Sequence, residues 1–251
     1  MTWQRTMKCL CVTWLMLGLA AFSSLAQSPE PANGKSNGHA PDAMAFSFVR
    51  IEWEGGRTGF GRGFGGRGPL WAHDYPTAEQ NLYVALDALT TLPITFENKV
   101  LSLRDEAIFD FPLLYICEVG YWTPDEEEAK FLSEYLKRGG FLIVDDFRSD
   151  FEWSNFVRQM QRIVPEAPQL LELDHPVFHC FFDFTELGLH SPYWGLTPHY
   201  YAIFDSEGRM MALINYNNDI GDGWEWPETD REFSTEAFKL GINYLIYAMT
   251  H

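Results

Sequence analysis

The sequence has few basic residues, and no long apolar run follows its first 26 residues. Lysine and arginine together number 18 against 35 aspartate and glutamate residues, which gives a formal net charge of −17. An acidic surface repels nucleic acid and anionic lipid, so we expect no nucleic-acid partner. A membrane-spanning helix needs about 20 apolar residues, so no membrane span is expected once the first 26 residues are removed.

Those first 26 residues have the pattern of a secretory signal peptide. Arg5 and Lys8 precede an almost entirely apolar run, Leu10–Phe22, and small residues at Ser24 and Ala26 suit a cleavage site. The alternative is an uncleaved anchor, for which the run is short. We therefore expect an exported protein, periplasmic or secreted.

Residues 27–45 are rich in proline, glycine, serine and asparagine, and they carry no apolar period. Such a segment buries too little surface to offset its ordering entropy, so we expect a disordered linker. Residues 46–251 are then a single α/β domain. Cleavage leaves Cys117 and Cys180, for which one disulfide and a buried free thiol at Cys117 both stay open.

The order of the predicted elements within this domain indicates an α/β fold. Apolar runs at 112–119 and 140–146 are typical of buried parallel strands, and the helix between them has Thr123 as cap and Gly139 as stop. Alternation of strands and helices favours a layered sandwich. The other expected elements are strands at 46–53, 100–103, 199–204 and 209–215 and helices at 77–91, 149–163 and 235–249.

Four motifs in this order resemble a bacterial family grouped as domain of unknown function 4159. They are Trp71-x-x-Asp74-Tyr75-Pro76, Gly139-Gly140-Phe141-Leu142 with Asp145-Asp146, Asp174-His175-Pro176-Val177-Phe178, and Lys239-Leu240-Gly241-Ile242-Asn243. The family is similar to the class I glutamine amidotransferase-like superfamily. The resemblance therefore implies a flavodoxin-like three-layer sandwich with a mostly parallel sheet, but it implies no established activity.

Acidic residues stand where the predicted parallel strands end, which is where open α/β sheets bind ligands. Glu118 follows the first buried strand, and Asp145 and Asp146 end the second. Adjacent residues point to opposite sides of a strand, so only one of the two aspartates is expected to enter the crevice. That residue would serve as general base, metal ligand or hydroxyl acceptor; alternatively, one aspartate caps the next turn and the other pairs with Arg148. Glu118 and Asp74 are ligand-binding candidates.

His175 is the third catalytic candidate. Asp174 would fix its ring so that it faces the crevice, although a purely structural turn explains the same residues. His175 and His179 have the spacing of two metal ligands on a helix, but Pro176 disfavours that helix. Cys117 lacks the small neighbours of a nucleophile elbow and is interpreted as a core thiol.

Two further features have weaker interpretations. Tryptophans near element ends suit sugar stacking or, alternatively, the cover of a core edge: they are Trp122, Trp153, Trp194, Trp224 and Trp226. The segment 215–222 (NYNNDIGD) has the composition of a cation-binding loop but not the spacing of an EF-hand, so a solvated turn is expected.

The segment Gly59–Gly68 (GFGRGFGGRG) contains the spacing of a dinucleotide-binding fingerprint. More than twenty residues separate the preceding strand from the next helix, so the tight turn of such a site is missing. We expect instead a flexible flap over the crevice, in which Arg57, Arg62 and Arg67 bind an anionic ligand or the protein's own acids. A disordered insertion is the alternative.

These observations favour an exported, non-catalytic module that binds a small molecule, a glycan or an envelope protein. The alternative is a hydrolase or transferase that acts on a polar, carbohydrate-derived substrate through Asp145 or Asp146 with His175. The sequence predicts no cofactor and no metal.

Overall fold

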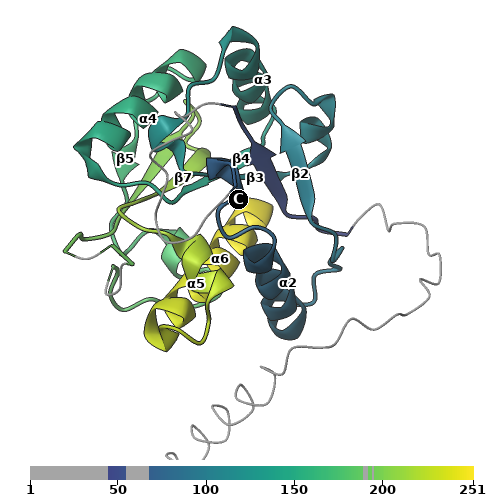
Figure 1. Cartoon of the computed structure of the whole chain (residues 1–251), viewed down its shortest axis with the longest axis vertical. Helices are drawn as coiled ribbons and strands as arrows, with labels where there is room; N and C mark the ends of the chain where they lie inside the picture. The colour runs from purple at the N-terminus through teal and green to yellow at the C-terminus, as the bar shows by residue number, and fades with distance from the viewer. Residues whose placement is uncertain (1–44, 55–67, 189–191, 194) are drawn as a thin grey trace, which may run out of the picture. The chain divides into compact units, whose positions relative to one another are not determined.

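The computed structural model in Figure 1 describes residues 45–54, 68–188, 192, 193 and 195–251. The expected signal peptide at 1–26, all but the last residue of the expected linker, and Arg57, Arg62 and Arg67 lie outside the described residues. The described part contains a seven-stranded sheet with helices on both faces.

The sheet is mostly parallel, and its strands follow the order β2-β1-β3-β4-β7-β6-β5. The first five strands in that order pair in parallel, whereas β6 is antiparallel to both β7 and β5. An α/β fold with a mixed sheet is therefore the architecture. The strands are β1 (Val49–Glu52), β2 (Lys99–Ser102), β3 (Leu113–Cys117), β4 (Phe141–Asp145), β5 (Gln169–Leu170), β6 (His199–Phe204) and β7 (Met210–Tyr216).

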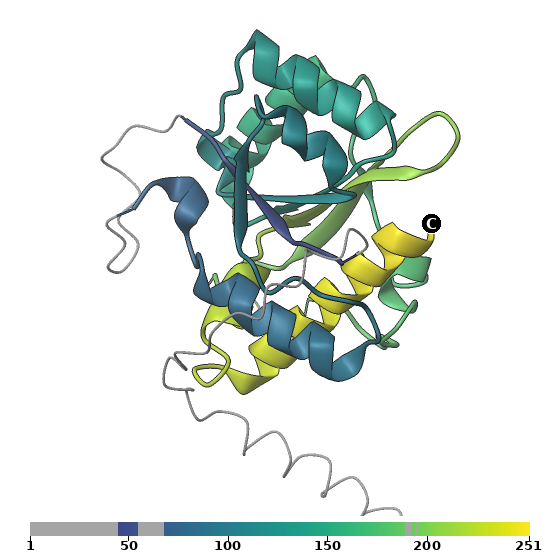
Figure 2. The same ribbon diagram turned by 90° about the vertical axis from the view of Figure 1, so that its right-hand side faces the viewer.

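Two helical layers cover the two faces of the sheet (Figures 1 and 2). On one face lie α2 (Thr77–Leu89), α5 (Ile220–Glu225) and α6 (Arg231–Thr250), and in Figure 2 the blue α2 and the yellow α6 run side by side. On the other lie α3 (Glu126–Lys137) and α4 (Ser149–Ile163). Short 3-10 helices are η1 (Leu70–Ala72), η2 (Glu106–Asp110), η3 (Val119–Tyr121) and η4 (Pro176–Phe178).

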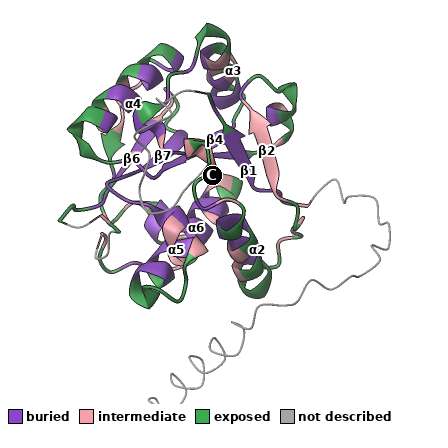
Figure 3. Cartoon of the chain, in the orientation of Figure 1, coloured by how far each residue is buried: buried purple, intermediate pink, exposed green. Residues whose placement is uncertain are grey.

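Alternating side chains of the central strands supply two separate cores. In β3, Tyr115 packs in the core beneath α2, α5 and α6, whereas its neighbours Leu114 and Ile116 pack beneath α3 and α4. Every residue of β3, β4 and β7 is buried, which matches the continuous apolar runs of the sequence (Figure 3). The carboxyl ends of these buried strands are therefore held in fixed positions.

The structure corrects several helix starts. Asp125, not Thr123, caps α3: its side chain accepts hydrogen bonds from the backbone N–H groups of Glu127 and Glu128, and Glu128 completes a capping box. α6 begins at Arg231 rather than at 235, because the Asp230 side chain accepts a hydrogen bond from the backbone of Phe233. α2 begins at Thr77, as expected, and it has no side-chain cap.

The segment 215–222 is not a solvated turn. It contains the end of β7 and the start of α5, and Asn215, Asn218 and Asp219 are buried. Their polar composition suggested solvent exposure, but Asn215 and Asn218 bond to side chains elsewhere in the chain, and Asp219 accepts from the backbone of Asp222. Asn215, for example, donates to Asp145 and accepts from Tyr244.

A membrane-spanning helix is not found in the described ranges: no helix there is both long and apolar enough to cross a bilayer.

Candidate metal centre

Four potential metal ligands from three parts of the chain converge at the carboxyl edge of the sheet. His73 and Asp74 follow η1, Asp146 follows β4, and Asp219 precedes α5. One ligand atom from each lies within 4.8 Å of all the others. The three aspartates are buried, whereas the His73 side chain is 42% exposed. The group is therefore a small acidic cluster that is accessible on the side of His73.

His73 lies at the centre of this group. Its Nδ1 atom is 2.7 Å from Oδ2 of Asp146, 3.7 Å from Oδ1 of Asp74 and 4.0 Å from Oδ2 of Asp219. The hydrogen bond to Asp146 raises the pKa of His73 to about 10, although burial opposes the increase. In the absence of another cation, the imidazolium is thus the positive charge that these carboxylates share.

Asp74 is the least compensated member. Its side chain has no exposed surface, and among the described residues no amide, hydroxyl or guanidinium group donates to either of its oxygens; its neighbours are the His73 ring and the carboxyl group of Asp222. Burial, together with the negative charges of Asp146 and Asp222, raises the pKa of Asp74 to about 9. A buried carboxylate without donors is costly, and a bound cation is one of the few partners that offsets the cost.

The adjacent Asp145 and Asp146 point to different surroundings, as expected. Asp145 is fully buried and accepts four hydrogen bonds, which tie β4 to β3, β7 and the start of α5; the donors are the Tyr115 hydroxyl (2.8 Å), the Asn215 amide (3.1 Å), and the backbone N–H groups of Ile220 (3.3 Å) and Gly221 (3.0 Å). Asp146 instead contacts His73 and accepts from the Tyr193 hydroxyl. Asp145 is therefore a structural tie, and Asp146 is the aspartate of this pair that joins the cluster of potential ligands.

Backbone strain is concentrated at this edge. Asp74, Glu118 and Asp146 have φ angles of 64°, 56° and 54°, in the left-handed region that non-glycine residues seldom adopt. Glu118 is held by its backbone N–H, which donates to the carbonyl oxygens of Asp145 and Asp146 at 3.2 and 3.1 Å. Burial, with the charge of Asp146, raises the pKa of the Glu118 carboxyl to about 8. Such strain clusters at functional sites.

Arg50 positions the segment that carries His73 and Asp74. It is fully buried within β1 and pairs with Glu79 of α2. Its Nη1 donates to the carbonyl oxygens of Trp71 (3.0 Å) and His73 (2.8 Å). The segment after η1 is thus fastened to the middle of the sheet rather than left as a free loop.

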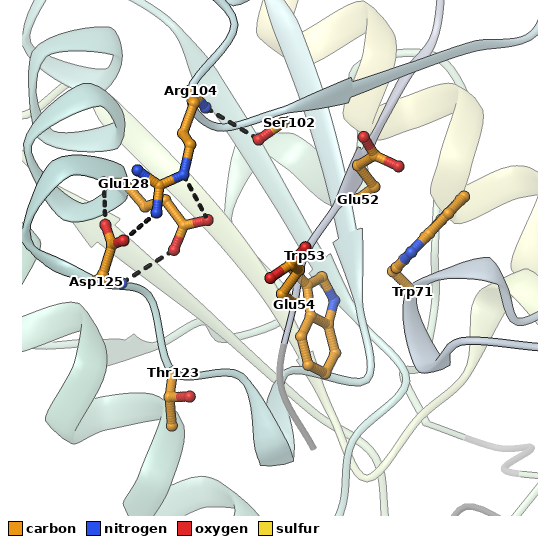
Figure 4. A pocket seen from close by; sticks show the side chains of 9 residues that line it. All are labelled: Glu52, Trp53, Glu54, Trp71, Ser102, Arg104, Thr123, Asp125 and Glu128. Carbon is orange, nitrogen blue, oxygen red and sulfur yellow. Dashed lines mark hydrogen bonds and ion pairs between the residues drawn. The ribbon is translucent and has the colours of Figure 1, made fainter. Parts of the chain in front are cut away.

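A cavity of about 460 Å³ lies beside this segment, beyond the ends of β1 and β2 and at the start of α3 (Figure 4). Trp71 and the carboxylates Glu52 and Glu54 lie on one side of it in Figure 4, and Arg104 lies across from them with Asp125 and Glu128. Arg104 is engaged by ion pairs with Asp125, Glu127 and Glu128. The cavity is therefore polar and acidic, with an indole at its edge.

The structure does not bring His175 to the aspartates. His175 caps η4, where it accepts a hydrogen bond from the backbone of Val177, and its ring packs against Phe204 and Tyr247. β6 is antiparallel, so Phe204 lies at the edge opposite the carboxyl ends of the parallel strands. His179 pairs with Asp183 and the carbonyl oxygen of Leu173, not with His175.

Cys117 and Cys180 are both free thiols. Burial raises the pKa of the Cys117 thiol well above its usual range, and the thiol accepts a hydrogen bond of 3.1 Å from Arg50. A buried, protonated thiol fits the core interpretation rather than a nucleophile.

Of the tryptophans, Trp122 and Trp224 are buried core residues, Trp153 stacks on Phe147, Trp226 is exposed, and Trp194 lies outside the described residues.

Sequence reasoning identified Asp74, Glu118 and Asp146 but missed His73, Asp219 and Arg50. A signal existed for each: His73 directly precedes Asp74, Asp219 lies in the polar segment 215–222, and Arg50 is a charged residue in an otherwise apolar strand. Because a charged side chain in a buried strand requires a partner of opposite charge, Arg50 alone predicts a buried ion pair.

Comparison with curated proteins gave no match. A family model described as a domain of unknown function matches residues 58–249, which includes the whole candidate metal centre. That coverage exceeds half of the chain, and it confirms the resemblance inferred from the four motifs. The chain therefore belongs to the DUF4159 family, a domain of unknown function.

Proposed function

We propose that this chain is a divalent-cation-dependent module, in which a cation held by His73, Asp74, Asp146 and Asp219 helps to bind a polar ligand. The observation that carries the proposal is Asp74, whose two carboxylate oxygens are buried, receive no hydrogen bond from an amide, hydroxyl or guanidinium group among the described residues, and lie with three other potential ligands. A cation supplies the missing partner and compensates the local negative charge.

The chemistry of the four side chains supports this choice. Carboxylates suit Mg²⁺, Ca²⁺ and Mn²⁺, whereas imidazole suits transition metals. Three aspartates and one histidine therefore favour Mn²⁺, a transition metal that also binds carboxylates. Ligand atoms on opposite sides of a cation lie about 4 to 5 Å apart, depending on its size. The 4.8 Å limit of the group is compatible with that range.

The adjoining cavity supports a polar ligand. Trp71 lines the cavity, and the Arg50 nitrogen that donates to its carbonyl oxygen also donates to that of His73. One fastened segment therefore carries both a residue of the cavity and a potential cation ligand. An indole beside several carboxylates suits a ligand with hydroxyl groups or a positive charge. A polar small molecule or a glycan fits that description.

Hydrolysis is the second candidate function. The exposed side of His73 leaves the cation group accessible, and an open coordination position is what allows a metal to bind and activate water. A cation held by these residues would supply the activation of water that hydrolysis of an ester or phosphate requires. The catalytic group would then be the cation with Asp146, without His175.

Two finer expectations remain part of the proposal. The five parallel strands follow the order 2-1-3-4-5 when they are numbered along the chain, which supports a flavodoxin-like arrangement and the implied amidotransferase-like superfamily. The cavity lies beyond the ends of β1 and β2, and β1 also borders the position between β1 and β3 where that order reverses and where such sheets bind ligands. Export to the periplasm or medium, and an envelope protein as partner, rest on the sequence alone.

The test is a thermal unfolding measurement on the full chain after chelator treatment, with Mn²⁺, Ca²⁺ or Mg²⁺ added back. At least one cation should raise Tm in the parent, and Asp146→Asn and Asp219→Asn should abolish the increase. Asp87→Asn, which removes an exposed acid of α2, is the matched control and should respond as the parent does. An unchanged Tm with every cation would disprove the proposal.

Hydrolysis is tested on the same samples with p-nitrophenyl phosphate and p-nitrophenyl acetate. Cation-dependent turnover that Asp146→Asn abolishes would favour the hydrolase. Binding of the cation with no turnover of either probe would favour the binding module.

A further inference from the structure

Asp74 lies between two groups of potential ligands, not one. Besides the group already described, Asp74, Asp222 and Glu225 each offer a ligand atom within 4.8 Å of the others. Asp74 is 4% exposed, and no amide, hydroxyl or guanidinium group among the described residues donates to either of its oxygens. A carboxylate that is this buried and belongs to both groups has the placement of a bridging ligand.

The short helix α5 presents the other two acids together. Asp222 and Glu225 are three residues apart, so they project from the same face of the helix. The helix is fixed at its start, where Asp219 accepts a hydrogen bond of 2.9 Å from the backbone of Asp222 and Asp145 accepts from Gly221. The second group is therefore built on a held element.

Gly221 permits the close approach of Asp74 to this helix. A Cβ atom at Gly221 would lie 2.6 Å from Oδ2 of Asp74, which is closer than any side chain tolerates. The absence of a side chain at this position thus allows the Asp74 carboxylate to lie against α5.

Among the described residues, the second group has one positive partner, His73, whose Nδ1 atom lies 3.7 Å from Oδ1 of Asp74. Within the described ranges, no lysine or arginine forms an ion pair with Asp74, Asp222 or Glu225. Asp222 and Glu225 are half-buried, so solvent screens their charges only in part. Three neighbouring carboxylates, with no lysine or arginine partner and one histidine shared with the first group, are a hard-oxygen ligand set.

We propose that the centre is binuclear: a second divalent cation is held by Asp74, Asp222 and Glu225, and Asp74 bridges the two cations. This inference rests on the proposed function, because the first cation shares Asp74. Two-metal centres hold their ions about 3.5 to 4 Å apart, a separation that one bridging carboxylate spans. Two adjacent cations select a ligand that carries an anionic oxygen group, such as a phosphate or a carboxylate.

The test is the stoichiometry of Mn²⁺ binding to the chelator-treated full chain, measured by the electron paramagnetic resonance signal of free Mn²⁺ and checked by calorimetry. The parent should bind two ions per chain, and the bound pair should give a spin-coupled spectrum. Glu225→Gln and Asp222→Asn should each leave one ion bound without spin coupling. Glu228→Gln, an exposed acid just beyond α5, is the matched control and should bind two ions.

The outcomes separate this inference from the proposed function. One ion per parent chain, with a count and affinity that Glu225→Gln does not change, would overturn the second site and leave the first. Zero ions in the parent would overturn both. Should Asp222→Asn unfold because it disturbs the start of α5, Glu225→Gln alone decides the question, since Glu225 is the last residue of α5.

Discussion

The guanidinium group of Arg50 donates a 2.8 Å hydrogen bond to the backbone carbonyl oxygen of His73, and thereby fixes a candidate metal ligand to the middle of the sheet. The same nitrogen reaches the carbonyl oxygen of Trp71, and Glu79 pairs with Arg50 from α2. Arg50 touches neither Asp146 nor Asp219 through any of these bonds. It is a positioning residue, and its effect on cation binding is indirect.

Replacement of Arg50 by lysine should weaken cation binding and stability together. Lysine keeps the charge but cannot reach Glu79 and both carbonyl oxygens in one geometry. We expect the free energy of unfolding to fall by about 2 to 4 kcal/mol and the affinity for Mn²⁺ to fall about tenfold or more. Denaturant unfolding and calorimetric titration measure the two effects.

A double variant separates positioning from stability. Arg50→Met with Glu79→Met replaces the buried pair by apolar side chains, which should recover part of the lost stability. It leaves the Trp71 and His73 carbonyl oxygens without their donor, so the affinity for Mn²⁺ should stay low. A double variant that binds Mn²⁺ as tightly as the parent would refute the positioning role.

The neighbours Asp145 and Asp146 should respond in opposite ways to the same substitution. Asp145→Asn places an amide against four donors, so we expect the free energy of unfolding to fall by about 2 to 4 kcal/mol. Asp146→Asn loses the charged partner of His73 but also removes one negative charge from an acidic group, so it should cost the metal-free protein less stability than Asp145→Asn does. It should nevertheless abolish cation binding.

Thermal and denaturant unfolding of the chelated proteins, followed by Mn²⁺ titration, check this pair. Equal losses of stability in the two variants would contradict the assignment of Asp145 as the structural tie.

Alanine at Gly221 should be unfavourable although the position is helical. Helix propensity alone favours alanine over glycine by about 1 kcal/mol. The new Cβ would lie 2.6 Å from Oδ2 of Asp74 and 3.0 Å from the Tyr115 hydroxyl, so Asp74 must move. We therefore expect lower stability and weaker Mn²⁺ binding, measured by unfolding and titration. Gly68→Ala, where a Cβ meets no atom within 4 Å, is the control and should bind as the parent does.

The stability of the metal-free protein should fall as pH rises from about 5 to 9. Burial raises the pKa of Asp74 to about 9 and that of Glu118 to about 8, and the hydrogen bond to Asp146 raises the pKa of His73 to about 10. Unfolded carboxyl groups titrate near pH 4 and unfolded histidine near 6.5. Over this window the folded state holds more protons than the unfolded state, so stability decreases with increasing pH.

Denaturant unfolding at pH 5, 7 and 9 in the presence of a chelator measures this slope, which we expect to amount to at least about 2 kcal/mol. Saturating Mn²⁺ should flatten or reverse the profile, because the cation replaces the protons. Constant or increasing stability of the chelated protein over this range would contradict the account.

Most of the fold was predictable because its signals are local. The buried strands β3 and β4 appear as continuous apolar runs, and α4 was predicted at its observed bounds, 149–163. Errors occurred at helix starts, where Thr123 and Asp125 both have the chemistry of a cap and only the geometry decides between them.

The candidate site was predictable only in part because topology assembles it. The parallel arrangement places Glu118 and Asp146 at one edge, and strand ends are visible in the sequence. By contrast, His73 and Asp219 are brought to Asp146 by segments more than 70 residues away, one of them fastened by Arg50. The segment 215–222 was expected to be exposed because it is polar, but Asp219 is buried. The polarity of a segment does not reveal which other parts of the chain pack against it.

The most direct measurement is anomalous X-ray diffraction from crystals of the full chain grown with Mn²⁺. The account predicts an anomalous peak bounded by His73, Asp74, Asp146 and Asp219, with the direct contact between His73 and Asp146 replaced by bonds to the ion. No peak at this position, with the hydrogen bond between His73 and Asp146 intact at saturating Mn²⁺, would contradict it.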